Sequence, residues 1–197
     1  YCLLTHDRQL IVGPGKVGEL GLTEHDRADQ LATFAGNHMI VTPAMSYLHT
    51  DTTLSALDRT RYLQLLTERR RLQAQRAAPA KRLKQMGAGG DPAVKAKLTE
   101  QIAELTQQID ERSRGMAACM KWRQSCDEPF ALILAGDTLF TGGTDRVTAY
   151  TAKDGRRIWS AEVDGHAHGL AFANGRLYVS TDQGVIHCFA RVAAEEE

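Results

Sequence analysis

The sequence has no long apolar run and few proline, cysteine or aromatic residues. No apolar stretch approaches the roughly 18 residues that mark a membrane-spanning helix, and no targeting segment precedes the first apolar residues. The formal net charge of the 197 residues is zero, which argues against a chain devoted to nucleic-acid binding. We therefore expect a globular protein without a membrane span.

The four cysteines, Cys2, Cys119, Cys126 and Cys188, are not spaced as zinc or haem ligands. Cys119 and Cys126 are the closest pair, so a disulfide is possible, although buried free thiols are the simpler expectation. The sequence also lacks G-x-S-x-G and any Ser or Cys set in a nucleophile motif. These absences favour a chain that is not an enzyme.

A G-x-G-x-x-G pattern occurs at Gly13, Gly15 and Gly18. A dinucleotide-binding loop with this pattern needs a helix directly after its glycines. Here "VGELGL" follows, and its glycines disfavour a first helical turn. Pro14 also removes one backbone amide that such a loop would use. We predict a turn between two strands.

Two parts of the chain repeat one another. Residues 7–22 align with 136–152, and residues 46–57 align with 177–188. Each copy contains short alternating strands separated by Gly, Asp or Asn turns. Four such strands per roughly 33 residues is typical of a propeller blade.

The segment "AYTAKDGRRIW" carries the pattern A-x-x-x-x-x-G-x-x-x-W at Ala149, Gly155 and Trp159. It resembles the tryptophan-docking repeat of quinoprotein-like (PQQ-like) β-propellers. The resemblance covers about 131–190 well and 1–58 more weakly. It implies that the tryptophan packs against a neighbouring blade and that the glycine makes a tight turn.

The resemblance implies a partial ring of four-stranded antiparallel blades, with the remaining blades outside this chain. We expect the first blade and part of the second in 1–58, and an inserted helical hairpin in 59–118. The rest of the second blade, with Trp122 in its outer strand, and the third and part of the fourth blade follow in 119–190. Residues 191–197 form an acidic tail or linker.

The inserted segment has the pattern of an antiparallel coiled-coil hairpin. An apolar seam at alternating four- and three-residue steps is present, and Asp91 followed by Pro92 predicts a helix start. The seam comprises Leu98, Ile102, Leu105, Ile109 and Met116.

Positive charge is concentrated in the first arm of this hairpin. Residues 59–86 hold nine Lys or Arg and one Glu, whereas 91–118 hold four against five acidic residues. The basic residues could pair with the second arm, for example Arg69 or Arg70 with Glu100 or Glu104, and simply form a solvated face. Alternatively, Arg69, Arg70 and Arg71 dock an acidic protein partner. Nucleic acid or anionic lipid are further alternatives.

His166 and His168 lie on the same face of an extended segment, as two metal ligands could. Two imidazoles without a nearby carboxylate or thiolate fall short of a site, so we expect no metal there. Asp51 and Asp182 occupy equivalent repeat positions, which favours a turn-capping role for both.

Some PQQ-like propellers are dehydrogenases that hold PQQ and calcium on the propeller axis. The vicinal cysteine pair that some of them carry is missing here, and no cluster of calcium-ligating carboxylates is evident. We therefore expect neither PQQ nor calcium. The sequence favours a non-catalytic binding or scaffold module with a protein partner, and the resemblance implies a periplasmic or otherwise extracytoplasmic location. The alternative is a fragment of a PQQ-dependent dehydrogenase, or a propeller fused to a separate catalytic domain.

Overall fold

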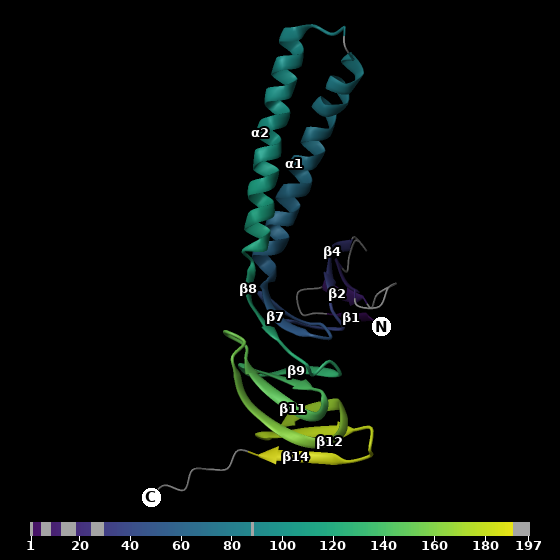
Figure 1. Cartoon of the computed structure of the whole chain (residues 1–197), viewed down its shortest axis with the longest axis vertical. Coiled ribbons are helices and arrows are strands. Elements are labelled where there is room, and N and C mark those ends of the chain that lie inside the picture. The colour runs from purple at the N-terminus through teal and green to yellow at the C-terminus, as the bar shows by residue number, and fades with distance from the viewer. Residues whose placement is uncertain (1, 5–8, 13–18, 25–29, 88, 191–197) are drawn as a thin grey trace, which may run out of the picture. The chain divides into compact units, whose positions relative to one another are not determined.

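The computed structural model describes residues 2–4, 9–12, 19–24, 30–87 and 89–190. These residues divide into two compact units: a β-sheet unit, and a helical unit that spans Asp58–Met120 (Figure 1). In chain order, the helical unit interrupts the β-sheet unit. Each unit is described by itself below.

The first sheet has four antiparallel strands in chain order: β1 (Cys2–Leu4), β2 (Gln9–Val12), β3 (Glu19–Glu24) and β4 (Gln30–Ala35). The glycine pattern itself lies outside the described residues, but both flanking strands are described. β3 begins at Glu19 and pairs antiparallel with β2, with Gly21 opposite Val12. A strand therefore stands where a dinucleotide-binding loop would require a helix.

The second sheet takes its last strand from beyond the helical unit. Its order is β5 (His38–Val41), β6 (Met45–His49), β7 (Thr53–Asp58) and β8 (Met120–Ser125). His38 lies opposite His49 in the β5–β6 register. Trp122 lies in β8, so the sheet is completed by a segment that follows β7 only after 61 intervening residues, Arg59 to Cys119.

The third sheet has six strands: β9 (Ala131–Ala135), β10 (Thr138–Gly142), β11 (Thr144–Thr151), β12 (Arg157–Ala173), β13 (Arg176–Thr181) and β14 (Ile186–Ala190). β12 pairs with β11 through its first half and with β13 through its second half. The repeats predict that the third blade ends at about Val163 and that the fourth begins near His166, whereas the structure makes these segments one strand. Gly165 has φ of 85° in the middle of β12, a conformation that bends the chain without a separate turn.

One apolar cluster joins the second and third sheets, and another lies within the third sheet. One joins residues of β6, β7 and the segment after β8 to residues of β10 and β11: Tyr47, Leu54, Ala56, Cys126, Leu139, Tyr150 and Ala152. The other joins the two halves of the six-stranded sheet: Phe140, Val147, Ala149, Val163, Ala167, Leu177 and Val179. Burial of these side chains supplies the main stabilisation of the β unit.

The helical unit contains α1 (Arg59–Met86) and α2 (Pro92–Ala117). Asp91 caps α2 by accepting a hydrogen bond from the backbone N of Ala93 at 2.9 Å, which confirms the predicted helix start. A proline inside a helix usually kinks or breaks it, but α1 continues as one helix through Pro79. Among the described residues, neither helix is long and apolar enough to cross a membrane.

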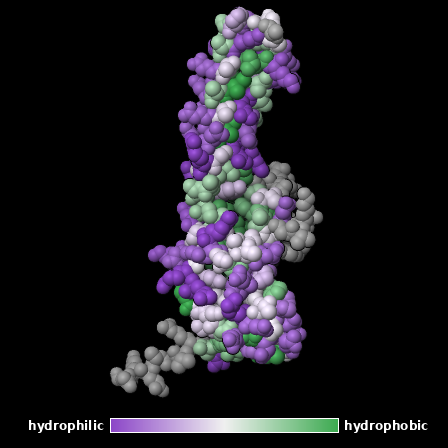
Figure 2. Space-filling model, in the orientation of Figure 1, coloured by the Kyte–Doolittle hydropathy of each residue, from purple (hydrophilic) through white to green (hydrophobic). Residues whose placement is uncertain are grey.

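The helices pack closely, and an ion pair joins the first half of α1 to the second half of α2. A Cβ added to Gly115 would lie 3.1 Å from a methyl carbon of Leu65. Arg112 Nε lies 2.6 Å from Glu68 Oε2. Glu68 is the single acidic residue of α1, and it pairs with Arg112 of α2. Figure 2 shows hydrophilic side chains, in purple, along this unit.

Three cysteines have described side chains, and all three are free thiols. Cys119 and Cys126 are buried, as expected, and Cys188 is exposed on β14.

Candidate functional site

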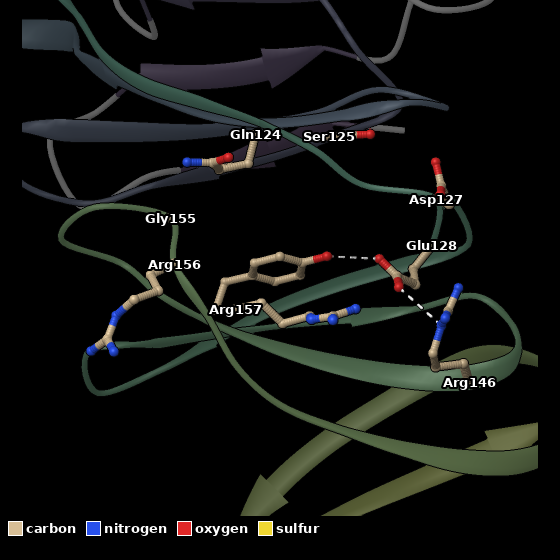
Figure 3. A pocket seen from close by; sticks show the side chains of 9 residues that line it. Gln124, Ser125, Asp127, Glu128, Arg146, Gly155, Arg156 and Arg157 are labelled. Atoms are coloured by element: carbon tan, nitrogen blue, oxygen red, sulfur yellow. Dashed lines mark hydrogen bonds and ion pairs between the residues drawn. The ribbon is translucent and has the colours of Figure 1, made fainter.

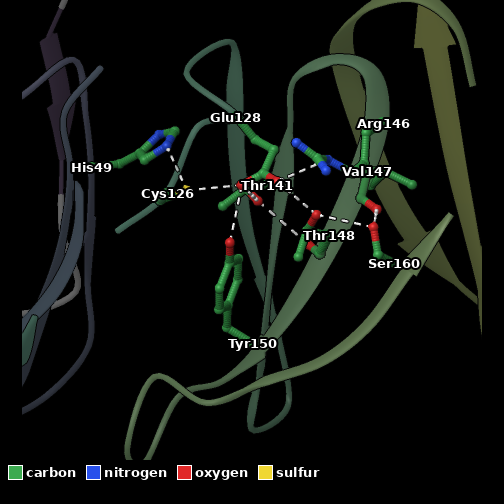
Figure 4. Close-up of polar contacts among 9 residues, drawn as sticks. All are labelled: His49, Cys126, Glu128, Thr141, Arg146, Val147, Thr148, Tyr150 and Ser160. Atoms are coloured by element: carbon green, nitrogen blue, oxygen red, sulfur yellow. Dashed lines mark hydrogen bonds and ion pairs between the residues drawn. The ribbon is translucent and has the colours of Figure 1, made fainter. Parts of the chain in front are cut away.

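A buried carboxylate lies at the centre of a polar network in the β unit (Figure 4). Glu128 follows β8 and is only 3% exposed. Its carboxylate accepts hydrogen bonds from the hydroxyls of Thr148, at 2.8 Å, and Tyr150, at 3.0 Å. Arg146 Nε lies 3.3 Å from Oε1. The buried charge is thereby paired and hydrogen-bonded, which removes most of its burial cost.

The network continues from Glu128 into the second sheet through a thiol and two imidazoles. Cys126 Sγ donates to Glu128 Oε2 at 3.2 Å and lies 3.5 Å from His49 Nε2. On its other side, His49 Nδ1 lies 3.3 Å from His38 Nδ1. The polar chain thus links β5 and β6 to β11 across the interface between the two sheets.

The environment keeps the thiol and the imidazole of this network neutral. Burial raises the pKa of Cys126 to about 11. Burial, with the neighbouring His38, lowers the pKa of His49 to about 4. Burial alone would raise the pKa of Glu128, but hydrogen bonds from Cys126, Thr148 and Tyr150 and the charge of Arg146 hold it below its usual value. A reactive cysteine needs a lowered pKa, so this network stabilises the sheet interface and is not arranged for nucleophilic chemistry.

The burial of His49 predicts that the protein is less stable in acid. Its pKa is lower in the folded state than in the unfolded chain, so the unfolded state binds more protons between pH 6.5 and about 4. The free energy of unfolding should therefore fall by about 3 kcal/mol as the pH drops through this window. Urea unfolding at a series of pH values measures the effect. His49→Gln should flatten the profile relative to His187→Gln, and identical profiles for the two variants would contradict the prediction.

A groove of about 450 Å³ lies beside the buried carboxylate. Figure 3 shows Glu128 and Arg146 at one end of it and Arg156 at the other. Three guanidinium groups reach the groove, and the carboxylate of Glu128 is already satisfied from within. Asp127 also lines the groove, so the lining combines guanidinium donors with a second acidic residue. Its lining comprises Gln124, Ser125, Asp127, Glu128, Arg146, Tyr150, Gly155, Arg156 and Arg157.

The structure places Trp122 against Gly155, two residues named by the motif analysis. A Cβ added to Gly155 would lie 2.5 Å from the Trp122 ring, and Trp122 Nε1 donates to the carbonyl oxygen of Ala152 at 3.1 Å. Ala149 lies in the other apolar cluster. Trp159 makes an edge-on contact with Phe189, with ring centroids 5.2 Å apart. The carbonyl acceptor at Ala152 was not identified from the sequence.

The three arginines proposed for docking lie in the first half of α1. Arg70 and Arg71 are exposed, and Arg69 is half-buried. At 100° per residue, Lys81 lies on the same side of the helix as Arg70, and Arg82 on the same side as Arg71. The exposed basic residues thus form two adjacent stripes along α1.

The structure brings His166 and His168 together with Asp182, a residue that the sequence analysis treats only as a turn cap. Asp182 does cap the segment, because the backbone N of His166 donates to its Oδ1 at 2.7 Å. Its other oxygen, Oδ2, lies 2.7 Å from His166 Nδ1. The sequence does not reveal the contact of this carboxylate with His166, because the two residues lie 16 positions apart along the chain.

The sequence analysis also missed Glu128 and His49. No motif includes them, and their partners come from β5, β6, β10 and β11. The sequence carries one indication of this network. Two acidic residues, Asp127 and Glu128, directly precede an apolar strand, and a carboxylate that is buried there needs polar partners.

Comparisons with known proteins give a family match over part of the chain and a fold. The family model described as outer membrane protein assembly factor BamB matches residues 108–195. No curated protein is a significant match to the sequence.

Among solved structures, the computationally designed Ika4 protein has a TM-score of 0.57 at 8% identity, with 95% of this chain and 88% of Ika4 covered. Sqt1 of Saccharomyces cerevisiae has a TM-score of 0.56 at 8% identity, with 96% of this chain and 44% of Sqt1 covered. BamB of Moraxella catarrhalis has a TM-score of 0.46 at 11% identity, with 95% of this chain and 57% of BamB covered. This chain therefore spans about half the length of these two natural proteins.

The predicted fold class, antiparallel propeller sheets with an inserted helical hairpin, is confirmed. The tryptophan-docking motif falls within the matched residues, as do β9 to β14. Residues 108–195 thus match a family model of the PQQ-like β-propellers that the repeats resemble.

Proposed function

We propose that this chain is a non-catalytic scaffold module that docks an acidic protein partner on α1. The propeller sheets supply a rigid base, and Arg69, Arg70 and Arg71 supply the docking face. The observation that carries the proposal is the excess of positive charge on α1, which holds nine Lys or Arg against a single Glu, and that Glu pairs with Arg112 of α2.

The charge distribution favours docking of a partner over the alternative, in which the basic residues of the first arm pair only with acidic residues of the second arm. Residues 59–86 have a net charge of +8, and the second arm, residues 91–118, has a net charge of −1. Neutralising the first arm therefore requires negative charge from elsewhere. Because Arg70 and Arg71 are exposed, a partner can reach them without rearranging the helices.

Charge reversal on α1 tests the docking face. The variant R69E/R70E/R71E should bind a fluorescein-labelled polyglutamate peptide about tenfold more weakly than the wild type, because three favourable contacts become repulsive. Fluorescence anisotropy at several salt concentrations measures the affinity and its electrostatic share.

The matched control is K81E/R82E/K84E, which changes the net charge by the same amount on the same helix. We expect it to weaken binding less than the Arg69–Arg71 reversal. Equal losses in both variants would show that only net charge matters, and unchanged binding after the Arg69–Arg71 reversal would refute the docking face. If duplex DNA or phosphatidylserine vesicles bind more tightly than the peptide, the partner of α1 is a nucleic acid or an anionic membrane and not an acidic protein.

We further propose that the module holds neither PQQ nor calcium and acts outside the cytoplasm. The matched family model is described as an outer membrane assembly factor, which supports an extracytoplasmic location and protein partners. Quinone absorbance or stoichiometric calcium in the purified full-length protein would overturn the scaffold assignment in favour of a dehydrogenase.

A further inference from the structure

A second polar cluster lies on β12 and the turn after β13, and it shares no residue with the Glu128 network. His166 and His168 are two residues apart on one strand. Both rings contact Phe130, with centroid distances of 4.9 Å and 4.8 Å, and the two imidazole centroids are 5.9 Å apart. The aromatic ring of Phe130 thus forms a shared wall that holds both imidazoles on the same side of the strand.

Asp182 approaches this pair from the turn after β13. Its Oδ1 is held by the backbone N of His166, which leaves Oδ2 against the imidazole Nδ1 at 2.7 Å. A Cβ added to Gly165 would lie less than 3 Å from Asp182 Oδ1. Only a glycine at that position therefore lets the carboxylate sit so close to His166.

The three residues supply a donor set that suits a late first-row metal ion. One ligand atom from each of His166, His168 and Asp182 can be chosen so that all three lie within 4.8 Å of one another. Imidazole nitrogen and carboxylate oxygen are ordinary zinc ligands, at about 2.0–2.2 Å from the metal. In a tetrahedral site, ligand atoms at such bond lengths lie about 3.3 Å apart, so small side-chain rotations suffice.

We propose that His166, His168 and Asp182 bind a divalent transition-metal ion, with Zn²⁺ the expected one. The cation displaces the proton between His166 Nδ1 and Asp182 Oδ2, and His168 supplies the third ligand. Water completes the tetrahedron, so the site has an exchangeable position. The side chains of His166 and Asp182 are 44% and 36% exposed, which leaves the site open to solvent.

Zinc titration of the untagged full chain tests the site. Isothermal titration calorimetry should give one Zn²⁺ per chain. His168→Ala and Asp182→Asn should each lower the affinity at least about tenfold. Asp182→Asn keeps an acceptor for the His166 backbone N, so it removes the charge and leaves the turn in place.

His187→Ala is the matched control, because His187 pairs with one carboxylate, Asp164, at 3.6 Å without a second imidazole. It should bind Zn²⁺ as the wild type does. Substitution with Co²⁺ should give a spectrum without sulfur-to-metal charge transfer, which distinguishes the site from binding at cysteines. No binding by the wild type, equal affinity in all variants, or a sulfur charge-transfer band would each overturn the proposal.

Discussion

Gly155→Ala should destabilise the β unit by about 3 kcal/mol or more. Gly155 has φ of 71°, which costs an L-residue about 1–2 kcal/mol. Its new Cβ would also lie 2.5 Å from the Trp122 ring, so the indole must leave its position between the sheets. Displacing it adds an overpacking cost of about 1–3 kcal/mol and breaks the hydrogen bond from Trp122 Nε1 to the Ala152 carbonyl. Urea unfolding measures the loss.

Gly184→Ala separates the two causes. Gly184 has nearly the same φ, 74°, and no described atom lies within 4 Å of a Cβ built on it. Its substitution should therefore cost only the backbone strain. In a Trp122→Ala background, the cost of Gly155→Ala should fall to that of Gly184→Ala. Equal effects of the two glycine substitutions in the wild type would refute the tryptophan contact.

Glu128→Ala should destabilise the β unit by about 3 kcal/mol. The carboxylate accepts the hydroxyls of Thr148 and Tyr150 and the thiol of Cys126 and pairs with Arg146. Its removal leaves buried donors without an acceptor, at about 1–3 kcal/mol for each one that stays unsatisfied. The loss of the half-exposed Arg146 pair contributes little, because solvent screens it. Thermal and urea unfolding both report the change.

Two further variants define the cause. Glu128→Gln keeps the shape of the side chain and one acceptor oxygen, so it should cost less than Glu128→Ala. Glu162→Ala removes an exposed glutamate that lies opposite Arg146 in the strand register, and should change stability by less than about 0.5 kcal/mol. If Glu128→Ala and Glu162→Ala have the same free energy of unfolding, the Glu128 network does not stabilise the protein.

The fold could be predicted from short-range signals in the sequence. Alternating apolar residues and Gly/Asp turns indicate antiparallel strands, and the heptad steps after Leu98 indicate a helix whose cap at Asp91 is confirmed. Ala149, Gly155 and Trp159 pointed to the propeller family because their spacing resembles that of its tryptophan-docking repeat. Each of these patterns spans only the residues of the strand, turn or helix that it specifies. It can therefore be recognised without knowledge of the tertiary structure.

The polar sites could not be predicted in this way, because their partners come from distant segments. Glu128 lies 79 positions after His49 and 22 before Tyr150, and only the stacking of the second and third sheets brings them into one network. The sequence indicates only a turn-capping role for Asp182, whereas the pairing of β12 with β13 places its second oxygen, Oδ2, against the imidazole of His166. The continuity of β12 was missed for a similar reason: the pairing of β11 on one half and β13 on the other makes one strand of two segments. Local periodicity determines which elements form, whereas packing between them decides which titratable groups meet.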